Sequence, residues 1–244
     1  QNVQQQAQAN TGDEVAILID GQRFRFWSEV RITRAIDTMD TAEFVAPFNS
    51  DAPGFRETFR PFSYKTVVIT VGGSPLFTGT MVGVSPSLDN ASKTITVSGY
   101  SLPGVLNDCT PPASSFPLEF NDQGLVEIAK TLAGPFGISV DFQADQGAVF
   151  ERVAITPGER VLTFLVKLAQ QRNLVISSSS RGKLVFLQSA ESGKPVANLA
   201  QGAAPVLSIT PFFSPQEYYS HITGLEPAII GVAGSQFTVK NPRL

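Results

Sequence analysis

Alternating apolar and polar residues dominate the first hundred residues. Val30 and Ile32 lie two positions apart, and Ala42, Phe44 and Ala46 repeat the same spacing. A period of two is typical of strands that bury one face. The run TVVITV (66–71) is a further strand candidate, so this region is predicted to be β-structure.

Turn signals separate these runs at short intervals. Asp20-Gly21, Gly72-Gly73 and Asp89-Asn90 each stand between two strand-like segments, and such pairs favour tight hairpins. Gly79 and Gly83 fall within a strand-like segment and indicate turns or bulges. About six strands between residues 14 and 101 predict a small antiparallel barrel or sandwich.

The middle of the chain changes to a helical period. One helix is predicted after Asn121 or Asp122, either of which is a plausible N-cap, and it ends at Gly134-Pro135, where glycine accepts a left-handed conformation. Its buried stripe is predicted to consist of Leu125, Ile128, Ala129 and Leu132. A strand, ISVDF (138–142), follows.

A second helix-then-strand unit follows the first. Thr156, Pro157 and Glu159 have the spacing of a capping box with proline at the first helical position. Asn173 ends this helix, and a hairpin forms around Arg181-Gly182. The predicted buried stripe is Val161, Leu165, Leu168 and Ala169.

The predicted fold class is α+β, mainly β. It comprises an antiparallel β-barrel, a small α+β region of two helix-strand units, and an incomplete second β-barrel. The expected domains are a flexible Gln-rich arm (1–13), a first barrel (14–105), an α+β domain (106–190), and a linker with the start of a second barrel (191–244). The chain begins at Gln rather than Met, so we expect it to be a segment of a longer or processed polypeptide.

Composition narrows the function classes. Charged residues make up only 16% of the chain, and it contains 18 Phe; either a surface buried between subunits or a Phe-rich core accounts for this. The net charge of −3 gives no general attraction to nucleic acid or anionic lipid. No secretory signal or membrane-spanning apolar run is present in the sequence.

Candidate catalytic chemistry is sparse. A single His, His221, and a single Cys, Cys109, give no metal-ligand set, and we expect a strand histidine and a half-buried cysteine. Asp37, Asp40 and Glu43 are clustered enough for a carboxylate pair, although they also suit a solvated turn between strands. No cofactor loop is found, so no cofactor, metal or catalytic residue is predicted, and the chain is not expected to be an enzyme.

Arginines concentrate in the first third of the chain. Phe24, Phe26 and Phe59 accompany them, as in a single-strand nucleic-acid groove, but the alternation in QRFRF (22–26) is better explained by a strand with one wet and one dry face. Interfacial pairing with acids of a neighbouring subunit is a further alternative. The arginines are Arg23, Arg25, Arg31, Arg34, Arg56 and Arg60.

An aromatic stretch near the end of the chain is the candidate subunit interface, since interface cores favour Tyr and Phe. Closure of a barrel core is the equal alternative. The stretch comprises Phe212, Phe213, Tyr218 and Tyr219.

The order of these elements resembles a known family. The segments SGYSLPGVLNDC (98–109), with its preceding hairpin, and AGPFGI (133–138), after the first helix, are similar to the baseplate hub proteins of Mu-like contractile phages, the gpP family. That family resembles in turn the hub part of VgrG spikes in type VI secretion.

The resemblance implies a structural role. Family members are expected to be homotrimers in which two barrels per subunit form a pseudo-sixfold ring. This ring adapts a hexameric tail tube to a trimeric spike and lets DNA or tape-measure protein pass. The implied partners are the tube, spike, baseplate wedge and tape-measure proteins, with no specific nucleic-acid binding and no membrane insertion. The implied location is the virion tail, assembled in the host cytoplasm.

Two other functions compete with the hub. The acidic cluster suits a tail-associated peptidoglycan or polysaccharide hydrolase. A carbohydrate- or receptor-binding tail module would instead display an exposed aromatic platform.

Overall fold

The computed structural model describes residues 14–90, 92–188, 200–202, 208, 210, 219–225 and 236–240. It divides into two units, Gln1–Glu191 and Ser192–Leu244. The first unit holds a large sheet followed by an α+β part, and each unit is described by itself below.

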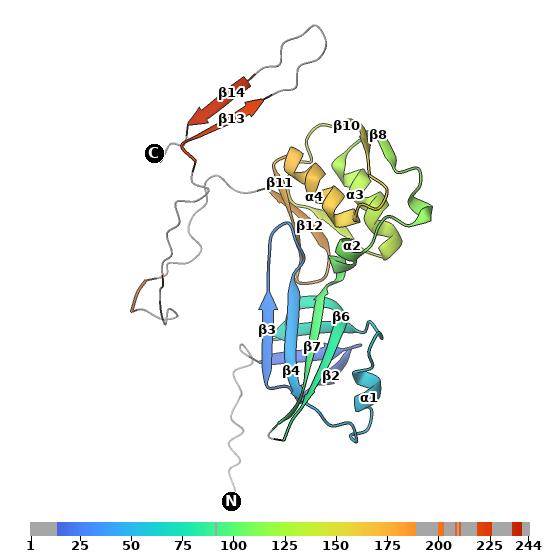
Figure 1. The fold of residues 1–244 in the computed structure, drawn as a ribbon, viewed down its shortest axis with the longest axis vertical. Helices are drawn as coiled ribbons and strands as arrows, with labels where there is room; N and C mark the ends of the chain where they lie inside the picture. The colour runs from blue at the N-terminus through green and yellow to red at the C-terminus, as the bar shows by residue number, and fades with distance from the viewer. Residues whose placement is uncertain are drawn as a thin grey trace, which may run out of the picture. The chain divides into compact units, whose positions relative to one another are not determined.

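The large sheet has seven antiparallel strands in its described residues (Figure 1). Their order is β2-β1-β5-β6-β7-β4-β3, and the sheet curls into a half-barrel. The expectation of about six strands agrees with this number to within one. The strands are β1 (Val15–Ile19), β2 (Gln22–Phe24), β3 (Glu29–Thr33), β4 (Thr41–Pro47), β5 (Thr66–Val71), β6 (Ser74–Leu88) and β7 (Lys93–Ser101).

The predicted hairpin turns are confirmed. Asp20 and Gly21 both have positive φ, 48° and 77°, and so do Gly72 and Gly73, 57° and 79°, as a type I′ turn requires. Gly79 serves a different purpose, because a Cβ there would lie 2.2 Å from the carbonyl oxygen of Tyr100. The sheet therefore uses glycine both to turn and to let two strands approach.

The predicted alternation defines the core of this sheet. Ala42, Phe44 and Ala46 are all buried, as are Ile69 and the other members of one cluster. The short helix α1 (Phe55–Thr58) adds aromatic rings to it. The ring centroids of Phe24 and Phe59 lie 5.3 Å apart at nearly right angles, an arrangement that aromatic rings favour. The curl of the sheet thus encloses a Phe-rich core, one of the two explanations of the composition.

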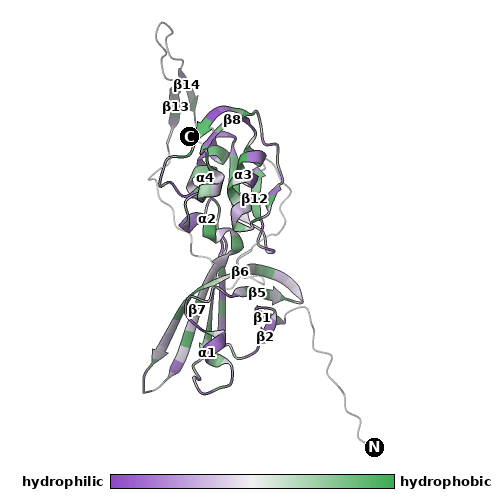
Figure 2. Ribbon diagram, turned by 90° about the vertical axis from the view of Figure 1, so that its right-hand side faces the viewer, coloured by the Kyte–Doolittle hydropathy of each residue, from purple (hydrophilic) through white to green (hydrophobic). Residues whose placement is uncertain are grey.

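The α+β part follows without a break in the described chain. A three-stranded sheet has the order β11-β12-β9, and β8 and β10 form a separate pair. Helices α3 and α4 carry largely hydrophobic colours in Figure 2. The elements are η2 (Leu102–Gly104), α2 (Val105–Asp108), η3 (Ala113–Ser115), β8 (Glu119–Gln123), α3 (Leu125–Ala133), η4 (Gly134–Phe136), β9 (Val140–Phe142), β10 (Phe150–Ala154), α4 (Val161–Gln171), β11 (Leu174–Ser178) and β12 (Leu184–Gln188).

Both predicted helical stripes are buried. Leu125, Ile128 and Leu132 of α3 are fully buried, and Leu165 and Ala169 of α4 pack into the same cluster. Full burial of one such aliphatic side chain contributes about 1.5–3 kcal/mol. The two helix-strand units therefore share one hydrophobic core, which is consistent with the predicted fold class, α+β and mainly β.

The start of α3 differs from the prediction, whereas its end at Gly134 is confirmed. Neither Asn121 nor Asp122 is the N-cap, because both belong to β8 and the helix follows Gly124. The carboxylate of Glu127 accepts the N–H of Gly124 at 2.7 Å. Gln146 Oε1 accepts the N–H of Val126 at 3.0 Å, which is the bond that a capping side chain would otherwise make. The left-handed residue at the other end is Gly137, with φ 70°, rather than Gly134.

The start of α4 was also placed wrongly. The helix begins at Val161 after Arg160, not after Thr156. The Thr156 N–H does donate to Glu159 Oε2 at 3.2 Å, as in a capping box, but Gly158 has φ 85°. A left-handed residue cannot occupy the first turn of an α-helix, so the motif closes a tight turn instead.

The second unit contains one antiparallel hairpin among its described residues, formed by β13 (His221–Leu225) and β14 (Gln236–Lys240). Most of the predicted linker lies outside the described residues. Within the described part of the chain, none of the helices has the length and apolar character that a membrane span requires.

Candidate functional site: the junction and an adjacent groove

The acidic cluster proposed for catalysis is part of a structural junction. Asp40 is only 2% exposed. Its Oδ1 accepts the N–H of Ala35 at 3.3 Å, and its Oδ2 lies 3.8 Å from Nε of Arg34. The expectation of a solvated acid was wrong at this position, because the β3–β4 connection folds back over its own carboxylate.

Asp37 joins the large sheet to the α+β part. Its N–H donates to the carbonyl of Ile176 at 2.7 Å, and its Oδ1 accepts the N–H of Ile176 at 2.9 Å. Its Oδ2 accepts a bond from Gln170 Nε2 at 3.2 Å. Asp37 therefore makes a two-way bridge to β11 and is not free for acid-base chemistry.

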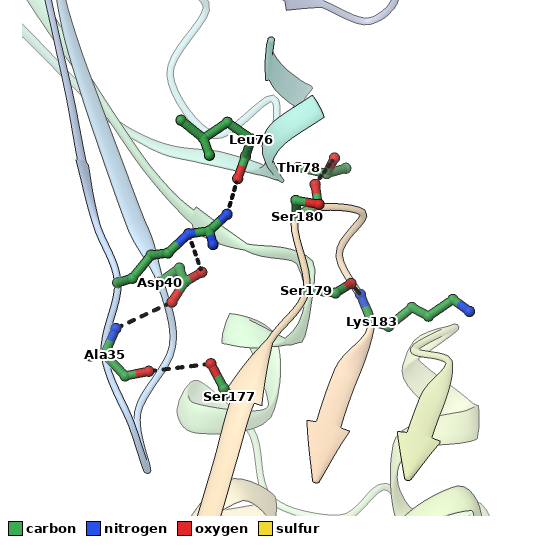
Figure 3. A network of polar contacts seen from close by, with 9 residues as sticks. Ala35, Asp40, Leu76, Thr78, Ser177, Ser179, Ser180 and Lys183 are labelled. Atoms are coloured by element: carbon green, nitrogen blue, oxygen red, sulfur yellow. Dashed lines mark hydrogen bonds and ion pairs between the residues drawn. The ribbon is translucent and has the colours of Figure 1, made fainter. Parts of the chain in front are cut away.

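Further hydrogen bonds tie the two parts together (Figure 3). The Thr78 hydroxyl donates to the carbonyl of Ser180 at 2.8 Å, and the Ser177 hydroxyl donates to that of Ala35 at 3.4 Å. Within the large sheet, Arg34 also donates to the carbonyl of Leu76 at 2.7 Å. The β11–β12 turn thus contacts β6, and both β11 and β6 contact the β3–β4 connection, through polar contacts that no sequence period indicated.

Glu43 does not share this environment. It lies on the exposed side of β4, directly opposite Arg31 of β3. Of the three predicted acids, the structure therefore engages two in the junction and leaves the third on an exposed sheet face.

The arginine-rich segment is largely paired locally. Arg23 forms an ion pair with Glu14, and Arg31 Nη2 lies 3.5 Å from Glu29 Oε1. Phe24 packs inward against Phe59, so the prediction of a strand with one solvent-exposed and one buried face is confirmed at Phe24. Phe26 lies beyond the end of β2 and is exposed.

The single histidine and cysteine lie in different units. His221 is exposed on β13, with Nδ1 3.1 Å from Ser220 Oγ, and Cys109 is half-buried. Both match the expected structural interpretation. Among the described residues, no group of three or more His, Cys, Asp or Glu side chains is arranged to hold a metal ion.

The predicted aromatic interface is mostly untested. Phe212, Phe213 and Tyr218 lie outside the described residues. Tyr219 is described and is 62% exposed. Its part in a subunit contact stays a prediction.

An apolar groove that sequence reasoning missed lies beside the junction. It measures about 680 Å³, and its walls come from both the large sheet and the α+β part. The groove forms only in the folded chain. The one sequence feature that could have indicated it is the pair of aromatic residues in PFSY (61–64). The lining residues are Phe62, Tyr64, Thr80, Val82, Tyr100, Leu102, Val105, Asp108, Cys109, Phe136 and Ile138.

A tyrosine-carboxylate pair lies in this groove. Burial, together with the charge of Asp108 and a hydrogen bond to it, raises the pKa of Tyr100 to about 12. The phenol therefore stays protonated at neutral pH and donates to the carboxylate. The arrangement suits binding and offers no activated nucleophile.

Comparison with solved structures places the fold among phage-type tail proteins. The chain is similar to the 43 kDa tail protein of prophage MuSo2 from Shewanella oneidensis, with a TM-score of 0.77 and 25% identity over 95% of this chain and 70% of that one. A tail protein from Neisseria meningitidis shares the fold, with a TM-score of 0.75 and 21% identity over 96% of this chain and 68% of that one. The class of protein is therefore a phage-type tail protein.

Matches to family models identify the particular kind of tail protein. Residues 14–101 match the N-terminal domain of the Mu phage baseplate assembly protein GpP-like family, and residues 103–188 match the second domain of the gp44-like baseplate hub proteins. Together they span nearly all of residues 14–188, which is more than half of the 244-residue chain. The chain belongs to the Mu-like family of baseplate hub proteins, as the resemblance indicated.

A curated relative supports this assignment. The baseplate hub protein gp44 of Escherichia phage Mu is 26% identical over 188 residues, which cover 73% of this chain and 46% of the relative. The chain thus spans less than half the length of that relative.

Proposed function

We propose that this chain is a structural part of the central hub in the baseplate of a contractile phage-type tail. The observation that carries the proposal is the succession of two hub-family domains along one chain, at residues 14–101 and 103–188. The location would be the virion tail, with assembly in the host cytoplasm.

The hub would be a homotrimer. Two barrels per subunit would make a pseudo-sixfold ring that adapts a hexameric tube to a trimeric spike, and its bore would pass DNA or tape-measure protein. The proposed domain boundaries are 1–13, 14–105, 106–190 and 191–244. Tube, spike, wedge and tape-measure proteins are the proposed neighbours.

A non-enzymatic role is part of the proposal. Two of the three candidate acids are engaged in backbone hydrogen bonds at the junction, which does not favour the hydrolase alternative. Purified protein should release no soluble fragments from peptidoglycan or polysaccharide, and Asp37→Ala should not alter that result. Hydrolysis lost on Asp37→Ala or Asp40→Ala would establish the rival.

Solution mass tests the assembly. We expect three chains per particle by light scattering or native mass spectrometry, and three copies on the tail axis in images of the assembled tail. A strictly monomeric protein over the micromolar range would overturn the trimer.

A receptor-binding module is the second candidate, because Phe62 and Tyr64 are 84% and 60% exposed beside the groove. Saturable binding of the monomer to purified cell-surface polysaccharide would favour it over the hub.

A further inference from the structure

The groove beside the junction carries two strained aromatic residues. Phe62 and Tyr64 have φ of 59° and 50° and are 84% and 60% exposed. Bulky residues rarely adopt this left-handed backbone, and such strain persists where the surroundings or a function require it. Their exposure means that internal packing does not explain the arrangement.

The groove has an unbalanced charge. Asp108 is its one carboxylate, and none of its lining residues is Lys or Arg. Asp108 is exposed and forms no ion pair within the described part of the chain. The complementary occupant is therefore an aromatic or apolar side chain with an adjacent cation.

The chain itself carries such an element. Phe26 is 74% exposed in the connection between β2 and β3. The preceding Arg25 is exposed and has no ion pair with any residue described. Phe116, another exposed aromatic, is flanked by Ser115 and Pro117 and lacks the charge.

We propose that the groove binds the Arg25–Phe26 segment of a second copy of this chain. The ring of Phe26 packs against Phe62 and Tyr64, and the guanidinium of Arg25 pairs with Asp108. The inference rests on the proposed homo-oligomeric hub and identifies one of its contacts. Because the segment and the groove are different patches, the contact is heterologous and suits a ring rather than a two-fold dimer.

A charge exchange tests the pair. Asp108→Arg and Arg25→Asp should each weaken self-association at least about thirtyfold, the order expected when a desolvated charge pair loses one partner. The double variant should recover most of that loss. Arg181→Asp, a matched change at an exposed arginine outside the groove, should have no effect, and circular dichroism checks that each variant folds.

The native cysteine in the groove allows a covalent test. Arg25→Cys places a thiol beside Asp108 of the partner subunit and hence near Cys109 of the partner subunit. Mild oxidation should therefore give interchain dimers and, as the ring closes, covalent trimers. Peptide mapping should find the introduced thiol at position 25 bonded to Cys109. The same variant with Cys109→Ser should stay monomeric on denaturing gels, as should Arg181→Cys with Cys109 intact.

The outcomes separate the two proposals. A wild-type chain that is monomeric overturns the trimer and this contact together. Self-association that is unchanged by Asp108→Arg and Arg25→Asp overturns this contact alone, as does a disulfide between position 25 and Cys109 within one chain of the Arg25→Cys variant. Saturable binding of the groove to another tail protein without loss on Arg25→Asp would also overturn it.

Discussion

Substitutions at Asp37 test whether the acidic cluster holds the junction together. This side chain bridges to β11 through the N–H of the fully buried Ile176, at 2.9 Å. Its backbone has φ 56°, a conformation that Asp and Asn tolerate better than other side chains. Alanine removes the acceptor and also strains the backbone, whereas asparagine keeps an acceptor and glycine relieves the strain.

The structure gives the expected ranking. Losing a bond between a charged acceptor and a buried N–H costs about 1.5–3 kcal/mol, and a non-glycine residue in the left-handed region costs about 1–2 kcal/mol. Asp37→Ala should therefore lower the free energy of unfolding by roughly 2.5–5 kcal/mol, since the two costs add. Asp37→Asn should cost about 1 kcal/mol, since it keeps an acceptor for the Ile176 N–H but loses the charge and the second acceptor, which faces Gln170 Nε2. Asp37→Gly should fall between them.

Urea unfolding measures the ranking, and hydrogen exchange at the Ile176 amide gives a local readout. Exchange should accelerate with Asp37→Ala and change little with Asp37→Asn. The reasoning would be refuted if Asn and Ala were equally destabilising, or if Ala cost less than about 1 kcal/mol, the smallest penalty for an unsatisfied buried N–H.

Three further predictions address the core, the sheet and the groove. Leu165→Ala should cost about 2–5 kcal/mol because the side chain is fully buried, whereas exposed Leu88→Ala should stay within about 0.5 kcal/mol; urea midpoints compare the two. Gly79→Ala should lower Tm more than Gly134→Ala, because its Cβ would lie 2.2 Å from the Tyr100 carbonyl, whereas nothing lies within 4 Å of a Cβ at Gly134 and the φ of Gly134 is −55°; equal Tm losses would contradict the close approach. The pKa of Tyr100 in the folded protein, about 12, exceeds its ordinary value of 10.0. The stability that this group contributes should therefore be complete below pH 10 and should be lost as the pH rises toward 12. Over that range the unfolding midpoint of Tyr100→Phe should fall less steeply than that of the wild type, and parallel slopes would contradict the pKa shift.

Local patterns predicted the parts of the fold that local energies decide. The Asp20-Gly21 turn and the alternation at Phe44 follow from backbone sterics and burial within a few residues. The start of α4 was misplaced because Gly158 adopts a left-handed backbone, which the capping-box spacing does not reveal. The spacing of a four-residue motif does not determine which backbone conformation its middle residues adopt.

The candidate site depended on longer-range contacts. Asp37 and Ile176 are 139 residues apart in the chain, and no period or motif joins them. Acids in a turn are normally solvated, so burial of Asp40 could only follow from the arrangement of the β3–β4 connection against the rest of the fold. The groove combines Tyr64, Tyr100 and Phe136 from three separate segments, and its shape is a property of their packing.

The junction and the groove are physically coupled. Val82 and Tyr100 in the groove belong to the large sheet, whereas Phe136 and Ile138 belong to the α+β part. The distance between these walls is therefore fixed by whatever holds the two parts together, which includes the Asp37 bridge to Ile176. A hub subunit must keep its contact surfaces rigid relative to one another, because small errors in angle prevent a ring from closing. Two of the acids that resemble a catalytic cluster in the sequence, Asp37 and Asp40, are thus engaged in the junction between the parts that form the walls of the proposed docking groove.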